Sequence, residues 1–123
     1  MSRTTSGLTA VSSDDVEHIL ETRLTSGIHV LSEYIPSVRS AAVGVWVRQG
    51  SAHETDFDSG VSHLLEHMVF KGTERRSASE IALSLESLGG FLDAYTTREH
   101  TSYQARVLDE HLGKALDVLA DLT

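Results

Sequence analysis

The sequence predicts an α+β domain in which a mainly antiparallel sheet packs against helices. Short stretches of alternating apolar and polar residues, which are typical of strands, occur in the first half of the chain and again after its middle. Two stretches between them, and one at the end, repeat apolar residues at helical spacing. Since strands that are joined by short turns pair antiparallel, this order predicts antiparallel sheet covered by helices.

The composition excludes several classes of protein. The 123 residues include 18 acidic residues and 10 Lys or Arg residues, without a basic block, so a nucleic-acid partner is not expected. The chain has no cysteine, so any metal must be held by His, Asp or Glu. It lacks the run of roughly 18 apolar residues that spans a membrane, and its start lacks the apolar segment of a secretory signal. We therefore expect a soluble, cytoplasmic protein of one domain, with no membrane partner.

The first part of the chain is expected to contain a polar lead-in followed by two strands. Residues 1–22 are mostly polar, so we assign the domain to residues 23–123. Residues 23–25 and 28–35 are predicted strands, joined by a tight Ser-Gly turn. The proline that follows ends the second strand because it has no N–H group for the ladder.

A third strand and a loop come next. Residues 41–49 alternate valines with Gly44, Trp46 and Arg48, which predicts a strand whose valines point inward. Trp46 is interpreted as a packing residue on the second face. Residues 50–59 are rich in Gly, Ser, Asp and Glu, and we expect them to form a loop.

A helix with clear start and stop signals is predicted after residue 77. Ser77 and Glu80 form a capping box, in which the Ser oxygen and the Glu carboxylate accept hydrogen bonds from free N–H groups. Apolar residues then recur at helical spacing until Gly89 and Gly90, which end the helix.

Two strands and a helix complete the predicted order. Residues 91–96 and 101–107 are predicted strands that are joined through a charged turn. Asp109 is expected to cap a last helix. The predicted buried stripe of that helix consists of Leu112, Ala115, Leu116 and Leu119. The chain then contains three strands, two helices, two strands and a helix, as expected for an α+β domain.

The stretch of residues 60–73 carries the candidate chemistry. If it is a helix, His63 and His67 lie one turn apart and Glu66 lies close beside them. Two imidazoles and a carboxylate on one face favour a divalent metal site over a merely solvated face. The other face is apolar, and we expect it to pack against the core through Val61, Leu64, Leu65, Met68 and Val69.

These residues resemble a known family along most of the chain. From about Arg23 to the end, the order of elements is similar to that in the N-terminal domain of the M16 metallopeptidases, the group of pitrilysin and the mitochondrial processing peptidase. The motifs that carry the resemblance are Gly60-x-Ser-His-x-x-Glu-His-Met-x-Phe-Lys-Gly-Thr73, Gly89-Gly90, Asp93-Ala-Tyr-Thr96, Arg98-Glu-His-Thr101 and Val118-Leu-Ala-Asp121.

The resemblance implies a zinc-dependent endopeptidase with an inverted His-x-x-Glu-His motif. His63 and His67 would bind Zn²⁺, and Glu66 would take a proton from the metal-bound water and pass it to the leaving amine. The implied substrate is a peptide or an unfolded polypeptide. The alternatives are a non-catalytic M16-like partner subunit and a structural or interaction domain, of which the last would hold no metal.

The resemblance also assigns a substrate edge. The strand around Asp93 and Ala94 would bind an extended peptide through backbone hydrogen bonds. Many family members have Asn at the first of these positions, and an Asp side chain cannot donate the amide N–H that Asn offers. An ordinary exposed strand residue is therefore the alternative for Asp93. Glu99 and His100 are interpreted first as turn residues, with a supporting role at the metal as the alternative.

One expected part of the site has no match in this sequence. In the family, a glutamate that follows the two histidines by roughly 70 to 80 residues is the third metal ligand, and that distance reaches beyond Thr123. We therefore expect a partial N-terminal domain that binds zinc weakly and cleaves little by itself. The resemblance further implies a partner, which is either a second, similar half or another copy of the chain.

Overall fold

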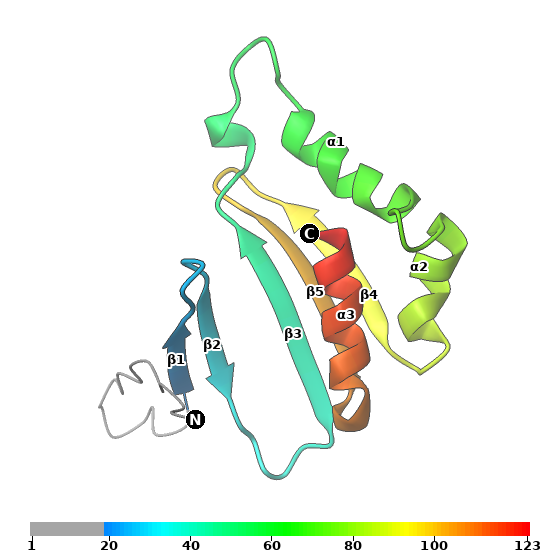
Figure 1. Ribbon diagram of the computed structural model, residues 1–123. Helices are drawn as coiled ribbons and strands as arrows, with labels where there is room; N and C mark the ends of the chain where they lie inside the picture. The colour runs from blue at the N-terminus through cyan, green and yellow to red at the C-terminus, as the bar shows by residue number, and fades with distance from the viewer. Residues whose placement is uncertain (1–18) are drawn as a thin grey trace. The chain divides into compact units, whose positions relative to one another are not determined.

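The computed structural model describes residues 19–123 (Figure 1). The chain divides into two compact units, one that ends at Val38 and one that spans Arg39–Thr123. Among residues 19–123, the first contains a hairpin of two strands, and the second contains the remaining strands, the helices and the buried core.

The hairpin differs from its prediction in the position of its first strand. The strands β1 (Ile19–Arg23) and β2 (His29–Glu33) pair antiparallel. The predicted strand at residues 23–25 is wrong, because the N–H of Leu24 donates to Ile28 across a wider loop (2.9 Å). Residues 19–22, which we assigned to the lead-in, belong to β1, while the rest of the lead-in lies outside the described residues.

A three-stranded antiparallel sheet forms the frame of the second unit. Its strands are β3 (Ser40–Val47), β4 (Phe91–Thr96) and β5 (Thr101–Leu108), in the order β3-β5-β4. All three strands lie close to their predicted positions. The α+β fold class and the mainly antiparallel pairing are therefore confirmed.

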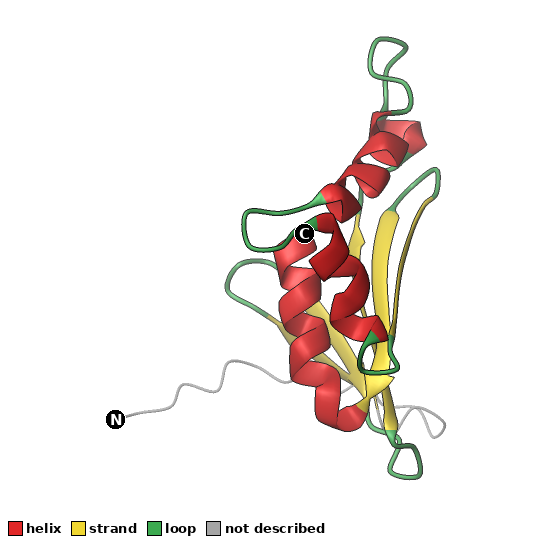
Figure 2. Ribbon diagram, turned by 90° about the vertical axis from the view of Figure 1, so that its right-hand side faces the viewer, coloured by secondary structure: helices red, strands yellow, loops and turns green. Residues whose placement is uncertain are grey.

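Helices cover one face of this sheet (Figure 2). They are α1 (Val61–Met68), α2 (Ala78–Glu86) and α3 (Leu112–Leu122), and short 3-10 turns flank them at Ser51–His53, Val69–Lys71 and Asp109–His111. The helix α3 packs on β5 and β3, and α2 packs beside it on β4. The helix α1 contacts β4. None of the described helices is long and apolar enough to cross a membrane.

The core lies between the sheet and the pair α2 and α3. Its buried residues alternate along β5 and recur at helical spacing in the two helices, and they are Ile81, Leu85, Tyr103, Ala105, Val107, Ala115, Val118, Leu119 and Leu122. The predicted stripe of the last helix is half correct. Leu112 and Leu116 are exposed, because the helix turns the line of Ala115, Val118, Leu119 and Leu122 toward the sheet.

The N-terminal cap of α2 follows the prediction, whereas the cap of α3 does not. Ser77 and Glu80 bond reciprocally, with the Glu80 carboxylate accepting from the Ser77 N–H (2.7 Å). Asp109 lies three residues ahead of α3 and does not cap it. Its carboxylate instead accepts from Arg39 (2.7 Å) and from the N–H of Glu110 (2.9 Å).

The expected burial of the apolar side of α1 is wrong for Leu64, Leu65 and Met68, whereas Val61 and Val69 are half-buried. Leu64, Leu65 and Met68 are 57%, 54% and 51% exposed. The side of the helix that faces inward carries the buried Ser62 and the half-buried Glu66, one turn apart. The helix is held on the sheet through Glu66 and through the turn that follows it, whose Val69 and Phe70 pack on the core.

Candidate metal centre

The helix α1 brings His63, Glu66 and His67 together. One ligand atom from each side chain lies within 4.8 Å of those from the other two. The Nε2 atoms of the two histidines are 3.0 Å apart, and their rings meet edge to face with centroids 4.6 Å apart. Both histidines are exposed, whereas Glu66 is half-buried. The arrangement expected from the helical spacing is therefore present.

The donor set fits a zinc ion. Zinc bonds to imidazole nitrogen at about 2.0–2.1 Å with tetrahedral geometry, which places two such nitrogens about 3.3 Å apart. The observed separation of 3.0 Å between the Nε2 atoms is close to that value. Both rings are open to solvent, so an ion can approach them. Among the described residues, no further His, Asp or Glu joins the group.

Thr96 holds the carboxylate of Glu66. Its hydroxyl donates to Oε2 of Glu66 at 2.5 Å, from the end of β4. Sequence reasoning missed this contact. The available signal was the alternation of β4, which places Thr96 on the same face as Leu92 and Ala94, and these two pack on the core. The bond fixes one oxygen of the carboxylate relative to the sheet.

Tyr103 lies beneath this carboxylate in the neighbouring strand. Its side chain is buried in β5, opposite Ala94 of β4. Burial, and to a smaller extent the negative charge of Glu66, raise the pKa of the Tyr103 phenol above its ordinary value of 10.0. The phenol is therefore neutral at physiological pH and adds no charge beside Glu66.

A second acidic residue, Glu54, contacts the start of α1. Its two carboxylate oxygens accept hydrogen bonds from the N–H groups of Gly60 (2.6 Å) and Ser62 (2.9 Å). These two bonds lower the pKa of the Glu54 carboxyl, since they favour its charged form. This contact could not be predicted, because capping motifs use closer spacing than six or eight residues.

The expected substrate residues lie on β4, beside α1. Within the unit Arg39–Thr123, β4 pairs with β5 alone, so its second edge is unpaired there. Ala94 packs inward against the core, while Asp93 is exposed. Alternation directs the Asp93 side chain to the face opposite Thr96 and Glu66. The structure therefore does not bring the Asp93 carboxylate to the metal centre, although the backbone of both residues lies in the edge strand.

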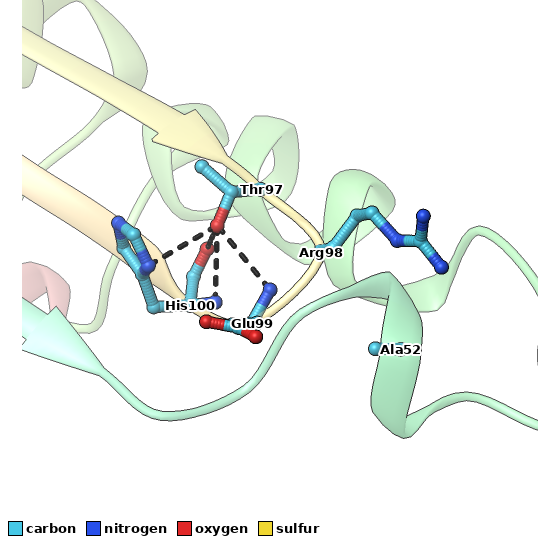
Figure 3. A pocket seen from close by; sticks show the side chains of 5 residues that line it. All are labelled: Ala52, Thr97, Arg98, Glu99 and His100. Atoms are coloured by element: carbon cyan, nitrogen blue, oxygen red, sulfur yellow. Dashed lines mark hydrogen bonds between the residues drawn. The ribbon is translucent and has the colours of Figure 1, made fainter.

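Glu99 and His100 lie in the turn between β4 and β5. The Thr97 hydroxyl accepts from the N–H groups of Glu99 (3.3 Å) and His100 (3.1 Å), which closes the turn (Figure 3). A shallow hollow of about 490 Å³ opens here, lined by Ala52, Thr97, Arg98, Glu99 and His100. The three residues of the metal centre are not part of its lining, so the hollow is a feature of the turn.

Comparisons with known proteins found a matching family and similar sequences. The model of the family described as Insulinase (Peptidase family M16) matches residues 29–123. A Bacillus subtilis protein named as an uncharacterized zinc protease, YmxG, is 54% identical over 97 residues, which are 79% of this chain and 24% of that protein. A probable beta subunit of the mitochondrial-processing peptidase of Arabidopsis thaliana is 49% identical over 111 residues, with 85% and 21% covered.

A solved structure is similar as well. The crystal structure of a protease from Helicobacter pylori matches this chain with a TM-score of 0.80 and 28% sequence identity. The match covers 85% of this chain and 25% of the Helicobacter pylori chain. The chain thus spans about a quarter of the length of the relatives that it matches.

Proposed function

The chain belongs to peptidase family M16, and from this premise we propose that it is the metal-binding part of a zinc-dependent endopeptidase. The observation that carries the proposal is the closeness of His63, Glu66 and His67 on α1, whose ligand atoms lie within 4.8 Å of one another. The group offers two imidazole nitrogens and a carboxylate oxygen, which are donor types that zinc binds in proteins.

The roles of the three residues follow from their chemistry. His63 and His67 would hold the ion, and their Nε2 atoms lie 3.0 Å apart. Zinc, when it is bound, supplies a Lewis acid that lowers the pKa of water to about 7 and polarises a peptide carbonyl. Glu66 accepts the proton of the attacking water and passes it to the leaving amine. Thr96 keeps the Glu66 carboxylate oriented for both transfers.

The substrate is a peptide or an unfolded polypeptide that lies extended along β4. An unpaired strand edge offers backbone N–H and C=O groups to such a chain. Asp93 and Ala94 contribute through their backbone groups, because the Asp93 side chain points to the other face of the sheet. The contact of α1 with β4 supports the proposal, since it brings this edge near the metal-binding histidines.

Partners and alternatives follow from the relatives' names. One relative is named as a beta subunit of a processing peptidase, so we propose a second M16-like half, or another copy of the chain, as the partner. A non-catalytic partner subunit is the alternative function. The presence of both histidines and of Glu66 in one constellation favours the catalytic function.

Metal binding is the first test. Calorimetric titration of the chain with Zn²⁺ is expected to show one weakly bound ion, because the described residues offer two histidines and one carboxylate. His63→Ala is expected to abolish the binding. A chain that binds no zinc would contradict the proposed function. Submicromolar zinc affinity together with peptide turnover would refute the expectation that the chain's ligand set is incomplete.

Catalysis is better tested in a longer protein. The chain can replace the matching quarter of the Bacillus subtilis relative, provided that the parent protein cleaves a test peptide. Glu66→Gln in this chimera is expected to abolish cleavage while the zinc content stays unchanged, since Gln cannot accept a proton. Cleavage that survives this substitution would exclude Glu66 as the base.

A further inference from the structure

The helix that carries the metal-binding histidines lacks a cap of its own. Its first residue is preceded by Gly60, which has a positive φ of 89° and no side chain to accept a hydrogen bond. Free N–H groups at a helix start need an acceptor. The carboxylate of Glu54 supplies it, because it accepts from Gly60 at 2.6 Å and from Ser62 at 2.9 Å.

Glu54 belongs to a segment, residues 50–54, that is itself fixed to the turn after β4. The N–H of Ser51 donates to the carbonyl of Thr97 (3.2 Å), and the N–H of Ala52 donates to the carbonyl of Arg98 (2.7 Å). Gly50 packs so closely there that a Cβ atom would meet the Thr97 carbonyl oxygen. Figure 3 shows Ala52 of this segment beside the turn. The segment is thus anchored before it reaches Glu54.

The helix is therefore held at two points. Its start is held by Glu54 from the anchored segment, and its middle is held by Thr96, which donates to Glu66 from β4. Ser62, whose N–H bonds to Glu54, directly precedes His63. A change in the first turn of α1 consequently moves His63 relative to His67, which lies one turn further along.

We propose that Glu54 is a positioning residue that fixes the first turn of α1, and with it His63, relative to the edge strand β4. The inference rests on the proposed function, since it concerns the same metal centre. Glu54 is not one of the three residues that make up the candidate metal centre. It acts through the helix start, by holding the two imidazoles at the separation that one ion requires.

Titration with Co²⁺, whose visible absorption reports the geometry of its ligands, tests the proposal. The variants are Glu54→Ala, Glu54→Gln and the matched control Asp56→Ala, which removes an exposed acid from the same loop. Loss of a helix cap typically destabilises the helix start. Since Co²⁺ binding must then restore the first turn of α1, we expect about a fivefold loss of Co²⁺ affinity in Glu54→Ala. Glu54→Gln keeps one acceptor oxygen and is expected to lie between this variant and the parent chain.

The possible outcomes distinguish failure of the role of Glu54 from failure of the proposed metal-binding function. An altered Co²⁺ spectrum and weaker binding in Glu54→Ala, with the control unchanged and partial rescue by Gln, support the inference. If Glu54→Ala and Glu54→Gln keep the affinity and spectrum of the parent chain, the inference fails while the metal centre stands. If the parent chain binds no Co²⁺, both fail. Should Glu54→Ala not fold, the nearly isosteric Glu54→Gln decides.

Discussion

Glu66 lies where the chemistry of the centre and the packing of α1 meet. The helix turns Ser62 and Glu66 toward the sheet, so the proposed base is half-buried while the histidines on either side of it are exposed. A polar residue in this position needs a partner, which Thr96 supplies from β4. The same hydrogen bond therefore holds α1 on the sheet and orients the Glu66 carboxylate.

Removal of the Thr96 hydroxyl is expected to weaken the attachment of α1 to the sheet. Thr96→Val keeps the shape of the side chain but leaves the Glu66 carboxylate without its donor, which should lower the free energy of unfolding by about 1 kcal/mol. Thr96→Ser keeps the hydroxyl and serves as the control. Urea unfolding at neutral pH measures both. Equal stability of the parent chain and Thr96→Val would show that the bond contributes nothing.

Residues of the site could be predicted from the sequence where their contacts are local. His63, Glu66 and His67 share one helical turn, so the period of 3.6 residues is enough to bring them together. Thr96 lies 30 residues from Glu66, and its contact depends on how α1 packs against β4. The orientation of Asp93 followed from strand alternation once the face of Ala94 was known.

Among the elements, the start of α2 and the end of α3 are joined by a network of charges. The Arg76 guanidinium donates to Asp121 at 2.6 Å and also to Asp117, and the Thr73 hydroxyl donates to Asp121 at 2.8 Å. The side chains of Arg76 and Asp121 are only 13% and 7% exposed. Charges in such surroundings interact more strongly than surface pairs, and they are costly when one partner is removed.

Loss of Arg76 is expected to be more damaging than loss of an exposed arginine. Arg76→Met should lower the free energy of unfolding by about 2 kcal/mol. This is less than for a fully buried pair, because the Asp117 side chain is partly exposed to solvent, which weakens its interaction with Arg76. Arg39→Met is the matched control, because the Arg39 side chain is 81% exposed in its pair with Asp109. Thermal unfolding of both variants measures the difference. Equal losses would contradict the assigned role of the network.

The same network predicts how stability depends on pH. Hydrogen bonds from Arg76 lower the pKa of Asp121, and those from Arg75 and Arg76 lower the pKa of Asp117, from the ordinary 3.8. The unfolded chain therefore binds more protons near pH 3.8 than the folded chain does. Stability is complete above this range and is lost as the pH falls through the lowered values.

Urea unfolding between pH 6 and pH 3 measures this dependence. The free energy of unfolding is expected to fall toward the acid end of the series, and Arg76→Met should flatten the slope because the folded pKa values return toward 3.8. An acid slope that is unchanged in this variant would show that other carboxyls cause it.

The exposed side of α1 gives a test of how this helix packs. Leu64 is 57% exposed and Leu85 of α2 is 1% exposed, although both occupy apolar positions in the sequence. Leu85→Ala is expected to cost about 3 kcal/mol, because it leaves a cavity in the core. Leu64→Ala should change the free energy of unfolding by less than about 0.5 kcal/mol. Similar losses at the two sites would mean that α1 buries its apolar side.

The order of the helices and strands could be predicted from the sequence. Which side of a helix is buried was harder to predict. The alternation of β3, β4 and β5 and the capping box of α2 are local patterns, and they were confirmed. The hairpin loop was wider than its Ser-Gly signal suggested. Periodicity alone marked an apolar side on α1 and on α3, but the neighbouring elements determine which side is buried.

At the scale of the whole molecule, the unit Arg39–Thr123 has a core and a candidate metal centre of its own. The chain spans about a quarter of the length of the relatives that it matches, so the activity of the whole protein is a proposal. The expected assignment of the domain to residues 23–123 and the cytoplasmic location stay predictions. What the unit itself offers is a pair of imidazoles and a carboxylate at the edge of a sheet.

The most direct test of this account follows the histidine side chains by nitrogen NMR while Zn²⁺ is added. The sequence has seven histidines, of which His63 and His67 are expected to shift together along a curve that fits one bound zinc ion. The same two signals should respond in Glu66→Gln. Zinc that instead perturbs the other histidines, or leaves these two unchanged, would contradict the metal centre on α1.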